Sequence, residues 1–221
     1  MGLDVQQWVN VLTGKLKGAF EARLLFVGLQ GSHRRGEAKP ASDIDIVVIL
    51  DTLSMEDLKH YKALIAGMSE KEKACGFIAG KDEIRNWPKM DIFQFKNDTM
   101  PLVGSLDGLV PEITRQDIEA YVRYSCANFY HMAVHSYLYD KNSDSLAFIV
   151  KPLLFLFQAM YYLRTGKYIS SKKELAGMLT REEKEMLEMD VGQMSGQELE
   201  RKYAGMIRYF SDGFVPGNKM R

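Results

Sequence analysis

The spacing of hydrophobic residues predicts two kinds of structure in this chain. Near the start, Val5, Trp8, Leu12 and Leu16 recur at helical spacing behind Asp4, a suitable N-cap, so a helix is predicted there. Further along, four short apolar runs are typical of strands, over residues 24–29, 43–50, 75–79 and 90–95. A helix is predicted over 54–68, because its apolar residues share one face.

The second half of the chain has a helical pattern throughout. Helical stretches are predicted over 114–138, 145–164 and 195–210, and Thr114 with Asp117 resembles a capping box. Gly104, Gly108 and Pro111 mark the junction between the halves. Strands followed by helices predict an α+β protein. We expect an α/β domain with a mixed sheet over residues 1–111, and a helical bundle over 112–221 that closes a substrate cleft.

Composition limits the possible partners. The 221 residues include 29 Lys and Arg and 29 Asp and Glu, so no global field favours stable binding of nucleic acid or of an anionic membrane. The most apolar run, 146–163, contains Lys151, Pro152 and Gln158 and is predicted to be a buried helix. Two cysteines without CxxC spacing and an N-terminus without a signal-peptide pattern predict a cytoplasmic protein.

Two carboxylates in an apolar strand are the most informative feature. Side chains alternate along a strand, so Asp43 and Asp45 are expected on one face, about 7 Å apart. Burying them among Ile and Val is costly unless a cation compensates their charge. Oxygen ligands of this kind suit Mg²⁺, which binds one or two carboxylates together with phosphate oxygens and water.

A glycine-serine turn precedes this pair. Gly31 and Ser32 follow the first predicted strand, where backbone N–H groups and a hydroxyl can bind a phosphate. Arg34 and Arg35 come next, and either guanidinium can clamp a triphosphate. The combination predicts a nucleotide-binding site.

This combination resembles the signature of the DNA-polymerase-beta-like nucleotidyltransferase superfamily, which is Gly-Ser, about ten residues, then Asp-hydrophobic-Asp. The resemblance implies two Mg²⁺ ions, both held by Asp43 and Asp45, and a nucleoside triphosphate as co-substrate. It further implies that Ser32 and an arginine hold the β- and γ-phosphates.

The superfamily also has a third metal-binding carboxylate on a later strand. The sequence around Asp91 matches its basic-hydrophobic-Asp-hydrophobic form, which implies that Asp91 holds the catalytic ion. Asp98, at the end of the same predicted strand, is an alternative, and Glu83 is a third candidate because some relatives use glutamate. The general base is left open between Asp91 and another acid.

A second resemblance concerns the helical half. Residues 162–173 resemble a segment of bacterial aminoglycoside adenylyltransferases, in which a helix ends in Thr-Gly-Lys and a later lysine reaches the nucleotide phosphates. Lys172 is that lysine by position. The alternative is an ordinary helix C-terminus, with Gly166 at C′ and lysines serving the helix dipole.

Two other groups are interpreted as structural. His131 and His135 lie four apart, but without an HExxH motif they are expected on an ordinary helix face. The acids at 182, 183, 185 and 188 are expected on a solvated helix face.

These features predict a nucleotidyltransferase. We expect it to move a nucleoside monophosphate, with ATP as the first donor to test, onto a hydroxyl of a small molecule such as an aminoglycoside-like antibiotic. A protein or RNA acceptor, as in toxin–antitoxin nucleotidyltransferases, and a non-catalytic nucleotide-binding module are the alternatives.

Overall fold

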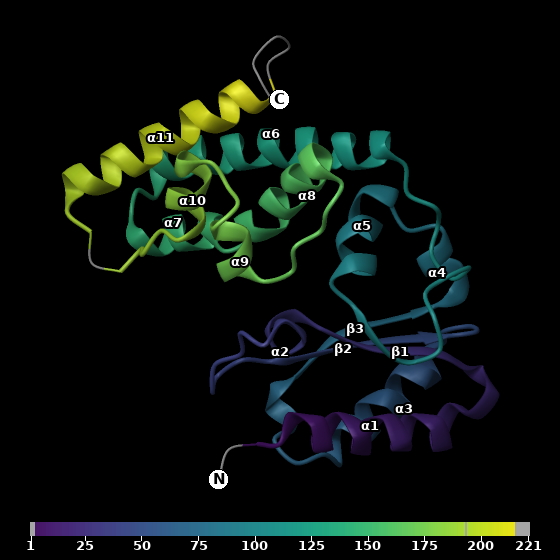
Figure 1. Cartoon of the computed structure of the whole chain (residues 1–221). Coiled ribbons are helices and arrows are strands. Elements are labelled where there is room, and N and C mark those ends of the chain that lie inside the picture. The colour runs from purple at the N-terminus through teal and green to yellow at the C-terminus, as the bar shows by residue number, and fades with distance from the viewer. Residues whose placement is uncertain (1–2, 193, 215–221) are drawn as a thin grey trace. The chain divides into compact units, whose positions relative to one another are not determined.

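The computed structural model describes residues 3–192 and 194–214 (Figure 1). The chain divides into two compact units, Met1–Ile113 and Thr114–Arg221. The first contains all four strands and the second only helices, within the described residues. The predicted α+β class, with a mixed sheet followed by a helical region, is therefore confirmed.

The sheet of the first unit has the strand order β3-β2-β1-β4. Its strands are β1 Leu24–Gln30, β2 Ile44–Leu50, β3 Ala74–Gly80 and β4 Met100–Val103. Strand β1 pairs antiparallel with both β2 and β4, whereas β2 pairs parallel with β3. A helix, α3 (Met55–Ala66), connects β2 to β3, as a parallel crossover requires.

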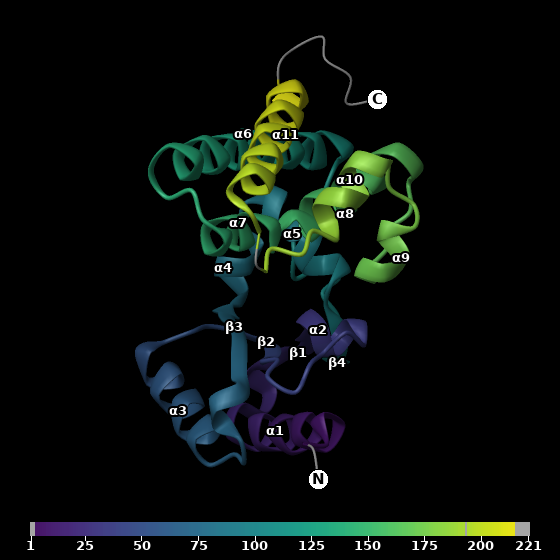
Figure 2. The same cartoon turned by 90° about the vertical axis from the view of Figure 1, so that its left-hand side faces the viewer.

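Helices cover both faces of this sheet (Figures 1 and 2). Helix α1 (Val5–Phe20) and α3 pack on one face, where the even-numbered residues of β2 are fully buried. Helices α4 (Lys81–Arg85) and α5 (Lys89–Asn97) contribute Ile84 and Ile92 to the other face, against Val47 and Ile49. Side chains alternate along a strand, so Asp45 belongs to this second face.

Helix caps form where the sequence predicts them. The Asp4 carboxylate accepts the Gln7 N–H at 3.0 Å, as an N-cap does. Thr114 and Asp117 form the predicted reciprocal capping box at the start of α6 (Arg115–Tyr139).

The prediction of a strand over 90–95 is wrong, because these residues lie in helix α5. Pro88 occupies the N-cap of that helix, and Asp91 lies in its first turn, where a negative charge suits the helix dipole. Ile92 and Phe93 are both buried although they are adjacent, which a strand with one covered face would not allow. The fourth strand is β4, five residues beyond the predicted one.

The second unit consists of packed helices. They are α6, α7 Ser143–Val150, α8 Leu153–Thr165, α9 Lys172–Ala176, α10 Arg181–Leu187 and α11 Gly196–Phe214. Helices α6 and α11 pack against each other (Figure 1). Between them, Phe129 stacks on Phe210 with ring centroids 5.3 Å apart, and the Ser136 and Tyr203 hydroxyls lie 2.6 Å apart. This seam is the core of the helical unit.

The apolar stretch predicted as one helix over 145–164 is two helices, α7 and α8. Lys151 and Pro152 separate them, because proline cannot supply the backbone N–H that a continuous helix needs. By length and composition Ser143–Thr165 resembles a membrane span, but 56% of its most apolar window is buried inside the protein. Leu153, Leu156 and Phe157 are completely buried, as predicted for core helices.

Candidate active site

The glycine-serine turn lies directly against Asp45. Strand β1 ends at Gln30, which pairs with Asp45 of β2, and the short helix α2 (Gly31–Arg35) begins at once. Gly31 has φ +71°, and a Cβ at this residue would lie 2.0 Å from Asp45 Oδ2. Only glycine permits both this backbone conformation and this approach. The antiparallel pairing thus joins the two motifs that the sequence separates by about ten residues.

Two carboxylates stand at the beginning of β2. Asp43 is exposed just before the strand, and Asp45 is half-buried within it. Two carboxylates in this position fit Mg²⁺, since this ion needs few protein ligands when phosphate oxygens complete its shell. Asp43 and Asp45 are the residues that would hold it.

Asp91 does not lie on a strand beside them. It is exposed in the first turn of α5, so the strand position on which its resemblance rested is incorrect. Over 3–192 and 194–214, no group of three or more His, Cys, Asp or Glu side chains is arranged to hold a metal ion. The role of Asp91 stays a prediction without this geometric basis.

The two alternative acids, Glu83 and Asp98, lie at different places in the first unit. Glu83, exposed in α4, follows Gly80 at the far end of β3, and its Oε2 lies 2.4 Å from where a Gly80 Cβ would stand. Asp45 pairs with Cys75, at the opposite end of β3 from Gly80. Cys75 and Gly80 are five strand positions apart, about 16 Å, so Glu83 lies beside the end of the strand that is far from Asp45. Asp98 is buried, forms an ion pair with Arg35 and accepts a hydrogen bond from the Gly31 N–H, so it lies beside the turn.

Cys75 occupies the strand position beside Asp45. The two residues are in register on the parallel strands β2 and β3, and the Cys75 side chain is hydrogen-bonded to Asp45. Burial, followed by the negative charge of Asp45, raises the pKa of the Cys75 thiol. The sequence carried no signal for this neighbour, because the register of a crossover-connected strand pair depends on packing and not on local pattern.

The two arginines of the turn differ in their surroundings. The Arg35 side chain is 10% exposed and makes ion pairs with Asp98 at 2.5 Å and with Glu37 at 3.4 Å. Arg34 donates from Nη2 to the Asn97 carbonyl at 3.3 Å. Arg35 is therefore paired with two acids, whereas Arg34 donates to a neutral carbonyl and its charge also acts on Asp98.

Lys172 begins helix α9 in the second unit, behind the N-cap Ser171, and is exposed. The preceding loop is held by Gln158, whose Nε2 donates to the carbonyls of Ile169 and Ser170 at 3.0 and 3.1 Å. Gly166 ends α8 with φ +73°, the ordinary C′ glycine of the alternative interpretation. Both interpretations of this segment are compatible with this geometry, and phosphate binding by Lys172 stays a prediction.

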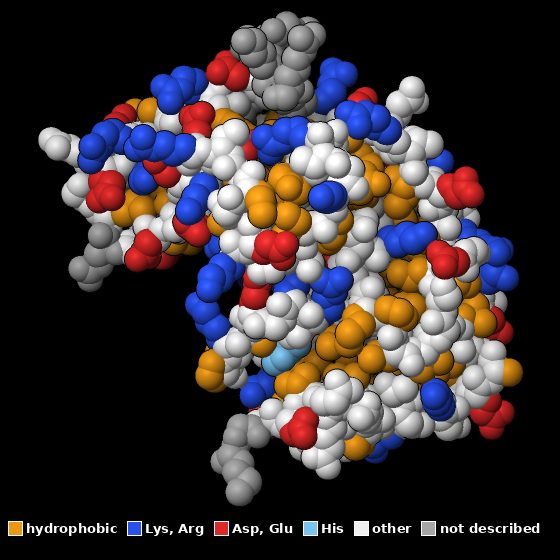
Figure 3. Space-filling view, in the orientation of Figure 1, with side chains coloured by type: hydrophobic (Ala, Val, Ile, Leu, Met, Phe, Trp, Pro, Cys, Tyr) orange, Lys and Arg blue, Asp and Glu red, His pale blue; other side chains and the backbone are white. Residues whose placement is uncertain are grey.

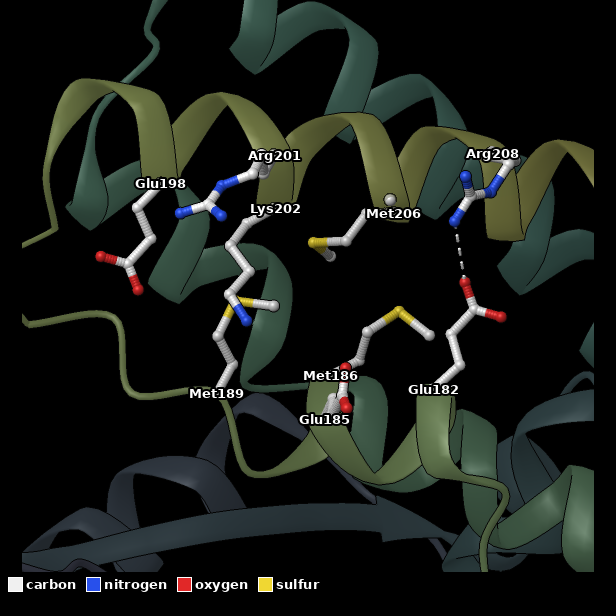
Figure 4. Close-up of a pocket in the computed structure, with 10 residues that line it drawn as sticks. Glu182, Glu185, Met186, Met189, Glu198, Arg201, Lys202, Met206 and Arg208 are labelled. Atoms are coloured by element: carbon white, nitrogen blue, oxygen red, sulfur yellow. Dashed lines mark ion pairs between the residues drawn. The ribbon is translucent and has the colours of Figure 1, made fainter.

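The acids over 182–188 do not form one solvated face. Glu183 is 2% exposed, and it binds Arg164 and the Tyr209 hydroxyl. Glu182 and Glu185 line a pocket of about 450 Å³ between α10 and α11. Figure 4 shows its mixed walls, which comprise three acids, three methionines and the cations Arg201, Lys202 and Arg208. A pocket with this balance of charge does not favour a polycationic ligand such as an aminoglycoside.

Surface charge and histidines add no further site. Basic and acidic side chains are interspersed over the visible face of the helical unit (Figure 3), as the balanced composition predicts. His131 and His135 are exposed on α6 with ring centroids 6.0 Å apart. Neither belongs to a set of three potential metal ligands within the described part of the chain.

The sheet, the turn and the paired acids have the arrangement expected of a nucleotidyltransferase domain of the DNA-polymerase-beta-like kind. Residues 15–97 match the family model described as "Nucleotidyltransferase domain". The resemblance inferred from the Gly-Ser and Asp-x-Asp motifs is confirmed by this match. No curated protein sequence matches the chain.

A solved structure extends the comparison to the helical half. The chain is similar to the spectinomycin adenyltransferase AAD(9) from Enterococcus faecialis, crystallised with ATP and spectinomycin. The likeness covers 95% of this chain and 98% of that one, with a TM-score of 0.56 and 16% sequence identity. At this identity the comparison shows a shared fold.

Proposed function

We propose that the protein transfers a nucleoside monophosphate from a nucleoside triphosphate to a hydroxyl group of a small molecule. The observation that supports the proposal is the contact between Gly31 and Asp45: a turn that would bind phosphate lies beside a carboxylate suited to a divalent cation. The nucleotidyltransferase match over 15–97 supports the same reaction class.

The residues of the first unit supply binding and orientation. The backbone of the Gly31 turn and the Ser32 hydroxyl would hold the terminal phosphates, and Arg34 would offset their charge. Asp43 and Asp45 would hold Mg²⁺, which when bound stabilises the charge on the reacting phosphates. The acceptor hydroxyl oxygen attacks the α-phosphorus, the bond to the β-phosphate oxygen breaks, and pyrophosphate leaves. The hydroxyl proton passes to a base that we do not assign.

A small acceptor agrees with the fold and the charge. The related crystal structure contains ATP and spectinomycin, and its likeness to this chain includes the helical half. The chain has no net charge that would attract a nucleic acid. ATP is the first donor to test, and an aminoglycoside-like hydroxyl compound is the first acceptor.

A non-catalytic nucleotide-binding module is the second candidate. The observation that favours it is Cys75, which stands beside Asp45 in the absence of a three-acid cluster among the described residues. Such a module would bind the triphosphate without releasing pyrophosphate. Turnover therefore separates the two candidates.

The decisive experiment measures pyrophosphate release from ATP, GTP, CTP and UTP with a panel of aminoglycoside-like acceptors and Mg²⁺. Asp45→Asn should lower release by several orders of magnitude and leave the fold intact, because it removes a ligand charge and little packing. Asp51→Asn, at the exposed far end of β2, is the control and should retain activity. An Asp45→Asn variant with wild-type turnover would refute the cation-binding role.

Nucleotide binding can be tested without turnover. Calorimetry should show Mg²⁺-dependent binding of at least one nucleotide, with affinity about tenfold lower in Ser32→Ala, since a hydrogen bond to a charged group is lost. Equal affinity in EDTA would contradict the proposal. Binding in wild type without pyrophosphate release from any acceptor would favour the non-catalytic module.

A further inference from the structure

The phosphate turn is anchored to one neighbouring segment of the first unit. This segment, 95–99, ends α5 and leads into β4. Three side chains in or next to the turn donate hydrogen bonds to it: Gln30 to Thr99 at 2.6 Å, Arg34 to Asn97 at 3.3 Å and Arg35 to Asp98 at 2.5 Å. The orientation of the turn therefore depends on residues about sixty positions later in the chain.

The ion pair between Arg35 and Asp98 is the strongest of these links. Both side chains are about nine-tenths buried, with 10% and 8% exposed. Burial raises the pKa of Asp98, while the positive charges of Arg35 and Arg34 and the nearby Gly31 N–H act in the opposite direction. Asp98 thus interacts with both ends of α2, through the backbone of Gly31 and the side chain of Arg35.

We propose that Asp98 is a positioning residue for nucleotide binding, acting through Arg35 to hold the Gly31–Arg35 turn in its phosphate-binding orientation. This inference rests on the proposed function. Asp98 itself does not contact the nucleotide, and its partner Arg35 serves the architecture of the turn. Arg34, the preceding residue, would then be the cation that binds the phosphates.

The ion pair with Arg35 also explains why residue 98 is an acid. A buried charged partner holds a guanidinium in one orientation more firmly than a neutral amide would, because the hydrogen bonds are charge-assisted. Removing the charge of Asp98 leaves the largely buried Arg35 without its main partner, so the guanidinium should turn toward solvent and release the turn. The expected consequence is a loss of ligand affinity that exceeds any loss of catalytic rate.

The test is a double-variant cycle on the full chain, with the dissociation constant of Mg-ATP, or of whichever nucleotide the wild type binds, measured by calorimetry. Asp98→Asn should raise the dissociation constant about tenfold, with kcat changed less than about twofold. In an Arg35→Ala background, Asp98→Asn should cause no further loss. The control is Asp107→Asn, which removes an exposed acid paired with Lys96 in the same unit and should change neither constant.

Each outcome has one meaning. Wild-type affinity in Asp98→Asn, or additive losses from the Asp98 and Arg35 changes, would overturn the positioning role. Failure of the wild type to bind any nucleotide would instead overturn the proposed function. If Asp98→Asn does not fold, Arg35→Met with Asp98→Leu replaces the pair by apolar side chains of similar size, a change that buried ion pairs tolerate. Wild-type nucleotide affinity in that folded variant would equally overturn the proposal.

Discussion

Gly31 and Asp45 are in such close contact that a single methyl group cannot be placed between them. The Cβ of any other residue at position 31 would overlap Asp45 Oδ2 at 2.0 Å, in a backbone conformation with φ +71°. The contact follows from the pairing of Gln30 with Asp45, which brings the end of β1 to the start of β2. Glycine at position 31 therefore permits both the backbone conformation of the turn and the close approach of the acid.

This relationship predicts different effects at two glycines of similar conformation. Gly31→Ala should lower transfer about a hundredfold, because the new methyl group displaces the Asp45 carboxylate by a distance that matters for catalysis. Gly36 has φ +70° and open space around its Cβ position, so Gly36→Ala is the matched control. It should cost about 1–2 kcal/mol of stability through the same backbone strain and retain transfer. Urea unfolding and pyrophosphate release measure the two effects, and equal loss of activity in both variants would contradict the explanation.

A buried acid in the helical unit should matter for stability. Glu183 accepts hydrogen bonds from Arg164 at 3.1 Å and from the Tyr209 hydroxyl at 2.8 Å. The burial of Tyr209, followed by the negative charge of Glu183, raises the pKa of the Tyr209 hydroxyl. Glu183→Ala should lower the free energy of unfolding by about 2–3 kcal/mol, because both donors lose their acceptor. Glu182→Ala, which removes an exposed neighbour, should change it by less than about 0.5 kcal/mol. Chemical denaturation of the two variants checks this, and similar values would show that Glu183 is not a structural acid.

Stability should fall in acid through Asp57. The Arg23 guanidinium donates two hydrogen bonds to this carboxylate, and with Ser54 it holds the pKa of Asp57 well below its usual range. A lowered folded-state pKa stabilises the protein above the unfolded value of about 3.9 and loses this effect as pH falls below it. The difference in unfolding free energy between wild type and Asp57→Asn should therefore shrink from about pH 5 downward.

The control for this titration is Glu56→Gln, which changes an exposed neighbour in the first turn of the same helix. Its difference from wild type should stay small and nearly constant over the same pH range. A wild-type minus Asp57→Asn difference that does not change with pH would contradict the role of the Arg23 pair.

The sequence was sufficient for those parts of the fold that local patterns determine. The strand over 43–50 and the capping box at Thr114 are of this kind, because side-chain alternation and hydrogen bonds to the helix end act within a few residues. The Gly-Ser and Asp-x-Asp motifs could be assigned to a family for the same reason. Their contact through Gly31 could be anticipated only from the resemblance.

Long-range packing decided the rest. Residues 90–95 were predicted as a strand, yet a helix begins after Pro88 and includes them. Two adjacent side chains of this helix, Ile92 and Phe93, are buried. The neighbours of the acids, Cys75 and the Asp98–Arg35 pair, depend on strand register and on a segment distant in sequence. No local pattern contains the positions of these neighbours. The third carboxylate was assigned to a strand for a different reason, because the local helix-start features, Pro88 and the acid in the first turn, were not used.

The last prediction concerns two adjacent lysines of the helical unit. We predict that Lys172 binds the triphosphate, on the strength of its resemblance to the adenylyltransferase lysine and of the Gln158 hydrogen bonds that order the loop before it. Lys172→Ala should then weaken nucleotide binding about tenfold, as loss of one charged hydrogen bond does. Lys173→Ala should change it little, because successive helical residues point about 100° apart. Calorimetry with Mg-ATP compares the two variants. If both changes have equal, small effects on affinity, Lys172 is an ordinary residue at the start of a helix. The likeness to the adenylyltransferases in this segment would then be one of fold alone.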